Sequence, residues 1–148
     1  MIEVLIDETP NPIEITRGCF HACRFCETPA LHRGTVRHRS VENVLHHVKT
    51  KLGRNIKDIR FISADAFGYG SAGPSAVDLR GLEALLCGCR ELAGKQARVY
   101  FGSFPSEVRP ESVTPQMLSL VKEHCTTRSI VVGIQSASPS MLRRLRRG

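Results

Sequence analysis

The sequence contains no tryptophan, few aromatic residues (5%) and no hydrophobic run of membrane-spanning length. Its longest apolar stretches, such as residues 130–134, fall far short of the roughly 20 residues that cross a bilayer. The opening stretch, MIEVLIDETPNP, has acidic residues and prolines where an export signal would need a basic head and a long apolar run. We therefore expect a cytoplasmic protein that makes no membrane contact.

The composition is that of an ordinary globular domain. The 148 residues are 41% apolar and 24% charged, which is enough to build one hydrophobic core and argues against global disorder. The net charge of +7 permits contact with a polyanion, but the basic residues are spread along the chain and only RRLRR, near the end, is dense. Charge alone therefore does not select a function.

Strand and helix patterns alternate along the chain. The hydrophobic periodicity predicts strands at residues 13–15, 58–63, 98–103 and 129–134, and helices at residues 41–52, 77–92, 115–125 and 138–145. Ser40 and Thr114 are expected N-caps, and the last helix is expected to open at Ser138. The fourth strand is almost continuously apolar, which is typical of a strand buried on both faces. Crossovers of this length predict parallel strands in an α/β fold that stops in mid-pattern at Gly148.

Three cysteines, Cys19, Cys23 and Cys26, form a C-x-x-x-C-x-x-C motif after the first strand. Without an export signal, they are interpreted as thiols or metal ligands rather than disulfides. Three thiolates on one loop can hold an iron–sulfur cluster and leave one iron open for a reactant. Two alternatives remain open, namely chance crowding of buried thiols and a structural zinc site. The candidates for a fourth zinc ligand are His21, His32 and His38.

The other three cysteines do not repeat this spacing. Cys87, Cys89 and Cys125 fall on or beside helical apolar stripes and are expected to be core residues. The stretch from Gly68 to Gly73 matches G-x-G-x-x-G. Its distance from the preceding strand and the proline after it favour a flexible loop near a cofactor over a dinucleotide site.

The cysteine motif, with Phe25 directly before Cys26, resembles the signature of the radical S-adenosylmethionine superfamily. The stretches CRFCETPALHRGTVRHRSVENVLHHV and GIQSASPSMLRRLRRG resemble segments of its methylthiotransferases and of relatives that carry a cobalamin-binding domain. The resemblance implies a partial (β/α) TIM-like barrel, truncated to about four β/α units. Residues 1–148 would be a core domain incomplete at its C-terminal end, without any N-terminal cobalamin-binding domain.

The resemblance also implies site residues. Cys19, Cys23 and Cys26 would ligate a 4Fe-4S cluster that reductively cleaves S-adenosylmethionine to a 5′-deoxyadenosyl radical. Phe25 would pack near the adenine or else fill the core. Where the superfamily usually has a Gly-Gly-Glu type motif, this chain departs from the pattern, and Asp65 would accept from the methionine ammonium or serve as a turn residue. The remaining cofactor-binding candidates are Ser63, Ala64, Ser103, Ser106, Glu107, Arg109, Gln135 and Ser136.

The implied partners are a flavodoxin- or ferredoxin-type electron donor and a substrate that the residues do not identify. Methylthiolation and methyl transfer both remain open, and cobalamin would enter only through a domain that this chain does not contain. Residues 141–147 could contact tRNA phosphates or form a solvated helix face. The competing hypothesis is a small zinc-binding module that binds nucleic acid.

Overall fold

The computed structural model describes residues 12–74 and 76–147. Residues 1–11, in which we expected no export signal, lie outside the described residues. It shows an α/β fold with a three-stranded parallel sheet in the order β1-β4-β5. These strands are β1 (Ile13–Glu14), β4 (Asp58–Ile62) and β5 (Arg98–Tyr100). The parallel pairing confirms the predicted α/β class, because each crossover passes through a helix.

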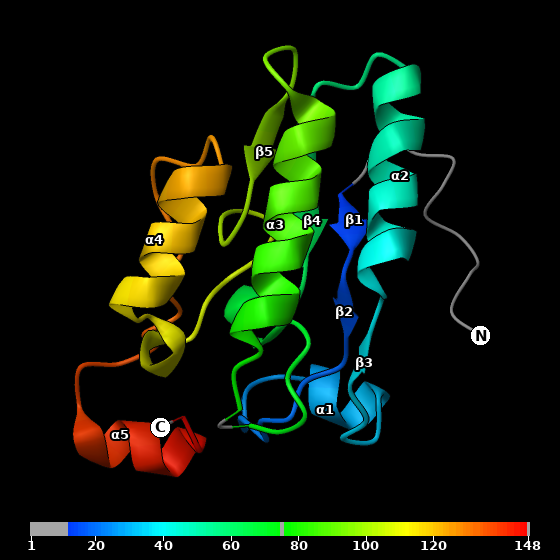
Figure 1. Ribbon diagram of the computed structural model, residues 1–148. Helices are drawn as coiled ribbons and strands as arrows, with labels where there is room; N and C mark the ends of the chain where they lie inside the picture. Colours follow the sequence, from blue (N-terminus) through cyan, green and yellow to red (C-terminus); the bar gives the residue numbers. More distant parts are fainter. Residues whose placement is uncertain (1–11, 75, 148) are drawn as a thin grey trace.

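Three long helices pack side by side on one face of this sheet (Figure 1). They are α2 (Val41–Gly53), α3 (Leu79–Ala93) and α4 (Pro115–His124). The shorter elements are α1 (Thr28–Leu31), α5 (Pro139–Leu145), the 3₁₀ turns η1 (Ala66–Gly68) and η2 (Pro110–Ser112), and an antiparallel pair formed by β2 (Thr16–Arg17) and β3 (Arg37–His38). None of the described helices is long and apolar enough to cross a membrane.

The helix starts follow from side-chain caps. Ser40, Thr114 and Ser138 each accept a hydrogen bond from a backbone N–H in the first turn of α2, α4 and α5, as predicted. Helix α3 begins at Leu79 rather than at Val77, because Asp78 is its cap and accepts from the Gly81 N–H at 2.9 Å. The local sequence therefore sets where the crossover helices begin.

The core lies between the sheet and the three helices. Burying a large apolar side chain contributes roughly 1.5–3 kcal/mol, so this layer supplies most of the stability. Its largest fully buried side chains are Phe61, Phe67, Phe101, Ile15, Ile59, Leu82, Leu85, Leu86, Met117, Val44, Val48 and Val99. Cys89 is buried among them and Cys125 packs against them, as expected. Cys87 is not a core residue, because it lies half-exposed on α3 with its thiol 3.6 Å from the Glu91 carboxylate.

The predicted strand at residues 129–134 is wrong. The segment forms only an isolated parallel bridge between Val132 and Val108, and Ile134 is 59% exposed. The outer edge of β5 is already occupied, because the hydroxyls of Thr126 and Thr127 accept from the Val99 and Phe101 N–H groups. No closed barrel forms among the described residues, since the sheet ends at β5.

Candidate functional site

The cysteine loop leaves β2 through a backbone position that only glycine fits. Gly18 has a φ of +89°, and a Cβ there would lie 2.0 Å from the Thr35 carbonyl oxygen. Cys23 is buried, Cys19 is half-buried and Cys26 is exposed, with the Cys26 N–H donating to the Cys23 carbonyl at 3.1 Å. The close approach to residue 35 therefore ties the start of this loop to the segment that leads into β3.

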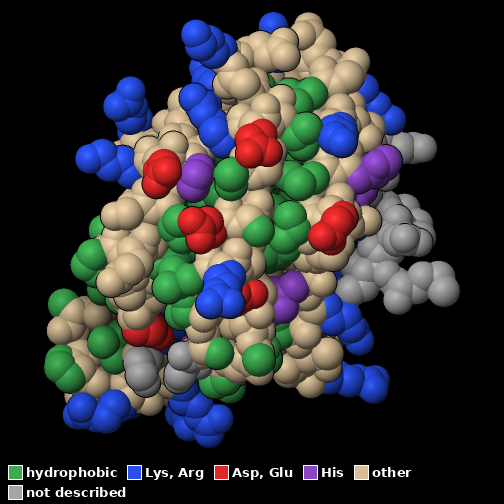
Figure 2. Space-filling model, in the orientation of Figure 1, with side chains coloured by type: hydrophobic (Ala, Val, Ile, Leu, Met, Phe, Trp, Pro, Cys, Tyr) green, Lys and Arg blue, Asp and Glu red, His purple; other side chains and the backbone are tan. Residues whose placement is uncertain are grey.

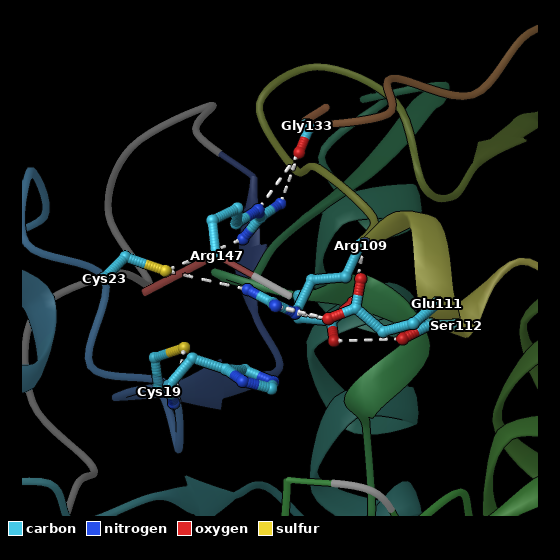
Figure 3. A network of polar contacts seen from close by, with 9 residues as sticks. Cys19, Cys23, Arg109, Glu111, Ser112, Gly133 and Arg147 are labelled. Carbon is cyan, nitrogen blue, oxygen red and sulfur yellow. Dashed lines mark hydrogen bonds and ion pairs between the residues drawn. The ribbon is translucent and has the colours of Figure 1, made fainter. Parts of the chain in front are cut away.

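Two arginines from distant parts of the chain lie against the thiol of Cys23 (Figure 3). The Nη1 atoms of Arg109 and Arg147 lie 3.7 and 3.9 Å from the Cys23 Sγ. Arg109 is only 3% exposed and forms an ion pair with Glu111. Arg147 donates two hydrogen bonds to the Gly133 carbonyl, at 2.6 and 3.1 Å. Two guanidinium groups beside one sulfur form a cationic wall that would attract an anionic ligand.

A pocket of about 470 Å³ lies beside the cysteine loop, and Cys19, His21, Asp65, Arg109 and Arg146 contribute to its wall. It lies where β2 leads into the loop and where the segment after β4 turns away from the sheet, so it is at the carboxyl end of the parallel strands. Ligands in parallel α/β folds gather at this end. A pocket of this size falls within the range that holds small molecules and cofactors.

Asp65 is the carboxylate of this pocket. Its Oδ1 accepts from the Arg109 backbone N–H and its Oδ2 from the Ser112 hydroxyl, both at 3.4 Å. Burial raises the pKa of the Asp65 carboxyl, while the hydrogen bond from Arg109 and the Arg109 charge oppose that shift. The neighbouring Ser63 is buried and donates to the Asp65 carbonyl at 2.8 Å, so its hydroxyl stabilises the turn that presents Asp65.

Burial also raises the pKa of the Cys19 thiol, and the nearby Cys23 contributes in the same direction, while the His21 N–H and Arg109 lower it. Figure 3 shows the sulfurs of Cys19 and Cys23 directed toward the side from which Arg109 approaches. Three thiols on one short loop fit an iron–sulfur cluster in their chemistry. Arg109 lies near Cys19 and Cys23, whereas Cys26 is exposed.

The zinc hypothesis loses His38 as a fourth ligand. Among the residues that the structure describes, no three His, Cys, Asp or Glu side chains form a group that could hold a metal ion, and this finding includes the three cysteines. Both ring nitrogens of His38 are engaged, at 2.9 Å from the Thr16 hydroxyl and 3.0 Å from the Ser71 carbonyl. Burial and the Arg109 charge lower the pKa of His21. His38 therefore has other partners, whereas the lowered pKa of His21 favours the neutral ring, which is the form that binds a metal ion.

The glycine-rich stretch from Gly68 to Gly73 lies beside the pocket rather than at a helix start. Gly68 and Gly73 contribute to the pocket wall, and a Cβ at Gly70 would lie 2.6 Å from the Asp78 carboxylate. Helix α3 begins only at Leu79, so no glycine of the motif forms its first turn. This placement supports a loop beside a cofactor and not the dinucleotide motif.

A second group gathers around Gly133. A Cβ at Gly133 would lie 2.5 Å from the Glu107 carboxylate, 2.8 Å from Arg147 and 3.1 Å from the Gln135 amide nitrogen. Glu107, Gln135 and Arg147 therefore converge on one backbone position, and Arg147 joins them to Cys23. Sequence reasoning missed Arg147, because its position in RRLRR looks the same as that of its exposed neighbours.

The other predicted site residues lie apart from the two groups or have structural partners. Phe25 is 50% exposed, so it does not fill the core, and Ala64 is also exposed. The Ser136 hydroxyl accepts from the Ser138 N–H at 3.1 Å, just before α5. Ser106 is buried and donates to the Phe61 carbonyl, whereas the Ser103 hydroxyl is buried without a hydrogen-bond partner in the described part of the chain.

Comparison with known proteins gives a consistent result. The model of the radical SAM superfamily matches residues 13–148. Ribosomal protein uS12 methylthiotransferases RimO from Kineococcus radiotolerans, Sorangium cellulosum and Endomicrobium trichonymphae are 33%, 30% and 31% identical to this chain over 91–92% of its length. The chain covers only 26%, 28% and 29% of these three relatives.

Proposed function

The chain belongs to the radical SAM superfamily, and we propose that it forms the part of an enzyme that binds a 4Fe-4S cluster and S-adenosylmethionine. Cys19, Cys23 and Cys26 would hold the cluster. A bound, reduced cluster would supply one electron to the sulfonium of S-adenosylmethionine, so that cleavage of a carbon–sulfur bond would give methionine and a 5′-deoxyadenosyl radical.

The observation that carries the proposal is the contact of two guanidinium groups with the thiol of Cys23, beside a pocket that Cys19 and Asp65 also line. Cysteines that bind a cluster do so as thiolates, so a cationic wall suits the negative charge of a cluster and its ligands. The wall also suits a ligand that brings its own carboxylate.

The chain's own groups match the two ends of an amino acid. Asp65 presents a carboxylate oxygen to the pocket and would accept from the methionine ammonium. Arg109 and Arg147 would donate to the methionine carboxylate, because a guanidinium can form two parallel hydrogen bonds with a carboxylate. Glu107 and Gln135 lie beside Arg147 and would position it. Ser63 contributes indirectly by holding the turn that carries Asp65.

The substrate belongs to the proposal as well. The relatives are named as methylthiotransferases of a ribosomal protein, and we extend methylthiolation to this chain as its reaction class. A one-electron donor of the flavodoxin or ferredoxin type would reduce the cluster. Since the chain spans about a quarter of those relatives, a test of the cofactor site is more direct than a test of substrate turnover.

Anaerobic reconstitution with iron and sulfide tests the cluster ligands. The wild-type chain should develop the broad visible absorption of an iron–sulfur cluster and bind iron and sulfide in equal amounts. Replacement of Cys19, Cys23 or Cys26 by alanine should abolish this absorption. The control Cys87→Ala, which alters a half-exposed cysteine on α3 outside the motif, should retain it. A single colourless zinc ion bound by the wild-type chain, with no cluster absorption, would overturn the proposal.

Cofactor cleavage is measured separately. With dithionite and S-adenosylmethionine, the reconstituted chain should release 5′-deoxyadenosine. Asp65→Asn should keep the cluster absorption but weaken S-adenosylmethionine binding, because the amide cannot form a charge-assisted bond with the ammonium. Loss of the cluster absorption in Asp65→Asn would show that Asp65 supports the loop rather than the cofactor.

A further inference from the structure

A second pocket, of about 840 Å³, lies at the opposite end of the parallel strands from the cysteine loop. It is formed where α3 and α4 end and where β5 begins, so it is at the amino end of the parallel strands (Figure 1). Five of its lining residues are cationic, and the described residues that line it include no Asp or Glu. We call it the basic groove, and its cations are Arg90, Lys95, Arg98, Lys122 and Arg128.

All five cationic residues are exposed, so their charges face solvent. Figure 2 shows Lys and Arg side chains gathered over this end of the molecule, at the top and upper left of the view. Only Arg98 forms an ion pair that the structure shows in the groove, with Asp58 at 2.7 Å, and both of those side chains are well exposed. An exposed pair of this kind is weak, so Arg98 remains able to bind a stronger anion.

The lining of the groove includes the apolar residues Val121, Cys125 and Ile130 and no aromatic residue. The cations come from three different segments of the chain. Cationic groups spaced around one groove suit a chain of phosphates, because each phosphate can approach a separate cation. Without an aromatic ring, the groove offers no platform on which a base could stack.

We propose that the basic groove binds the phosphodiester backbone of an RNA strand, independently of its sequence. An acidic peptide fits less well. One way in which an extended peptide gains affinity is by pairing with the free edge of a sheet, but the Val99 and Phe101 N–H groups at the edge of β5 already donate to Thr126 and Thr127. The groove therefore offers charge but no backbone pairing, which favours phosphate contacts.

This proposal does not rest on the cofactor site. It also places the nucleic-acid contact elsewhere than residues 141–147, because Arg147 lies against Cys23 and Arg146 lines the cofactor pocket. The basic groove and the cysteine loop lie at opposite ends of the parallel strands, so an RNA strand in the groove would not block the pocket.

Fluorescence anisotropy with a labelled single-stranded oligouridine tests the proposal on the complete 148-residue chain. The groove variant is Arg90→Gln/Lys122→Gln/Arg128→Gln. The matched control is Lys49→Gln/Arg80→Gln/Arg144→Gln, which removes one lysine and two arginines, all exposed, from outside the groove. Circular dichroism and the melting temperature verify that both variants fold, and polyglutamate serves as the competing acidic polymer.

Each phosphate contact adds about 0.7 to the slope of log K against log salt for a single strand. The groove variant should therefore show a slope smaller in magnitude by about 2, and an affinity weakened by about tenfold at about 50 mM salt. The control should stay within about twofold of the wild type, and a mixed-sequence RNA should bind as tightly as oligouridine.

Three results would overturn the proposal. Equal weakening in both variants would mean that the overall charge attracts RNA without a site. A lack of RNA binding at low salt would exclude RNA as the ligand of the groove. Polyglutamate binding that depends on the groove residues, in the absence of RNA binding, would assign the surface to an acidic protein.

Discussion

Replacing Arg109 by methionine tests whether the buried guanidinium group is as strongly engaged as the structure indicates. The Arg109 side chain is 4% exposed and its partner Glu111 is 47% exposed. Breaking a fully buried ion pair costs about 3–5 kcal/mol, but Glu111 can recover much of its hydration here. Methionine also removes the cost of burying a charge. We therefore expect Arg109→Met to lower the free energy of unfolding by about 1–2 kcal/mol.

For a chain of this length, each kcal/mol lowers the melting temperature by about 3 °C, so the expected decrease is about 3–6 °C. The measurement is a thermal scan of the chain without cofactors under anaerobic, reducing conditions. Arg98→Met is the matched control, because the Arg98–Asp58 pair is exposed on both sides and contributes at most about 1 kcal/mol. A larger decrease in Arg98→Met than in Arg109→Met would refute the assignment of Arg109 as the more strongly held group.

Two further predictions concern the cysteine loop and the core. Gly18→Ala should unfold the cysteine loop or destabilise the chain far more than Gly34→Ala does. Both glycines have a positive φ, but only at Gly18 would a Cβ collide with the backbone, at the Thr35 carbonyl. Urea unfolding of the two variants measures this, and equal stabilities would contradict it. Burial, with a contribution from Cys125, raises the pKa of the Cys89 thiol to about 12 from near 9.0, so the folded chain keeps a proton that the unfolded chain loses. The contribution of Cys89 to the free energy of unfolding should therefore be intact below about pH 9 and fall as the pH rises toward 12. Urea unfolding should show that Cys89→Ala loses less stability at alkaline pH than the wild type. An equal loss of stability in Cys89→Ala would exclude Cys89 as the source of the pH dependence.

The helix starts and the cysteine motif could be predicted because they depend on neighbours in the chain. Ser40, Thr114 and Ser138 cap helices through contacts with the residue three positions later. The spacing of the three cysteines likewise needs only the reach of one loop. These features were therefore visible without knowledge of the fold.

The fourth strand shows where this reasoning fails. Residues 129–134 are apolar enough for a buried strand, and no local signal argues against one. Two threonine hydroxyls compete for the same strand edge, and this competition arises only once α4 has brought Thr126 and Thr127 beside β5. Whether a segment pairs as a strand depends on its partner, so the hydrophobic periodicity could not show that residues 129–134 would form no strand.

The sequence by itself determined the caps of the crossover helices and the loop that carries three thiols, because each of these is set by residues within a few positions of one another. It also determined the parallel α/β class, because strand and helix patterns alternate along the chain and long crossovers require parallel strands. Only the tertiary structure decided which of many arginines lie against Cys23. Arg109 and Arg147 are 86 and 124 residues away from it along the chain. Their side chains are no different in composition from those of the exposed arginines. The burial of an arginine side chain and the direction in which it points are properties of the packed molecule. They distinguish the two arginines beside Cys23 from arginines that face solvent.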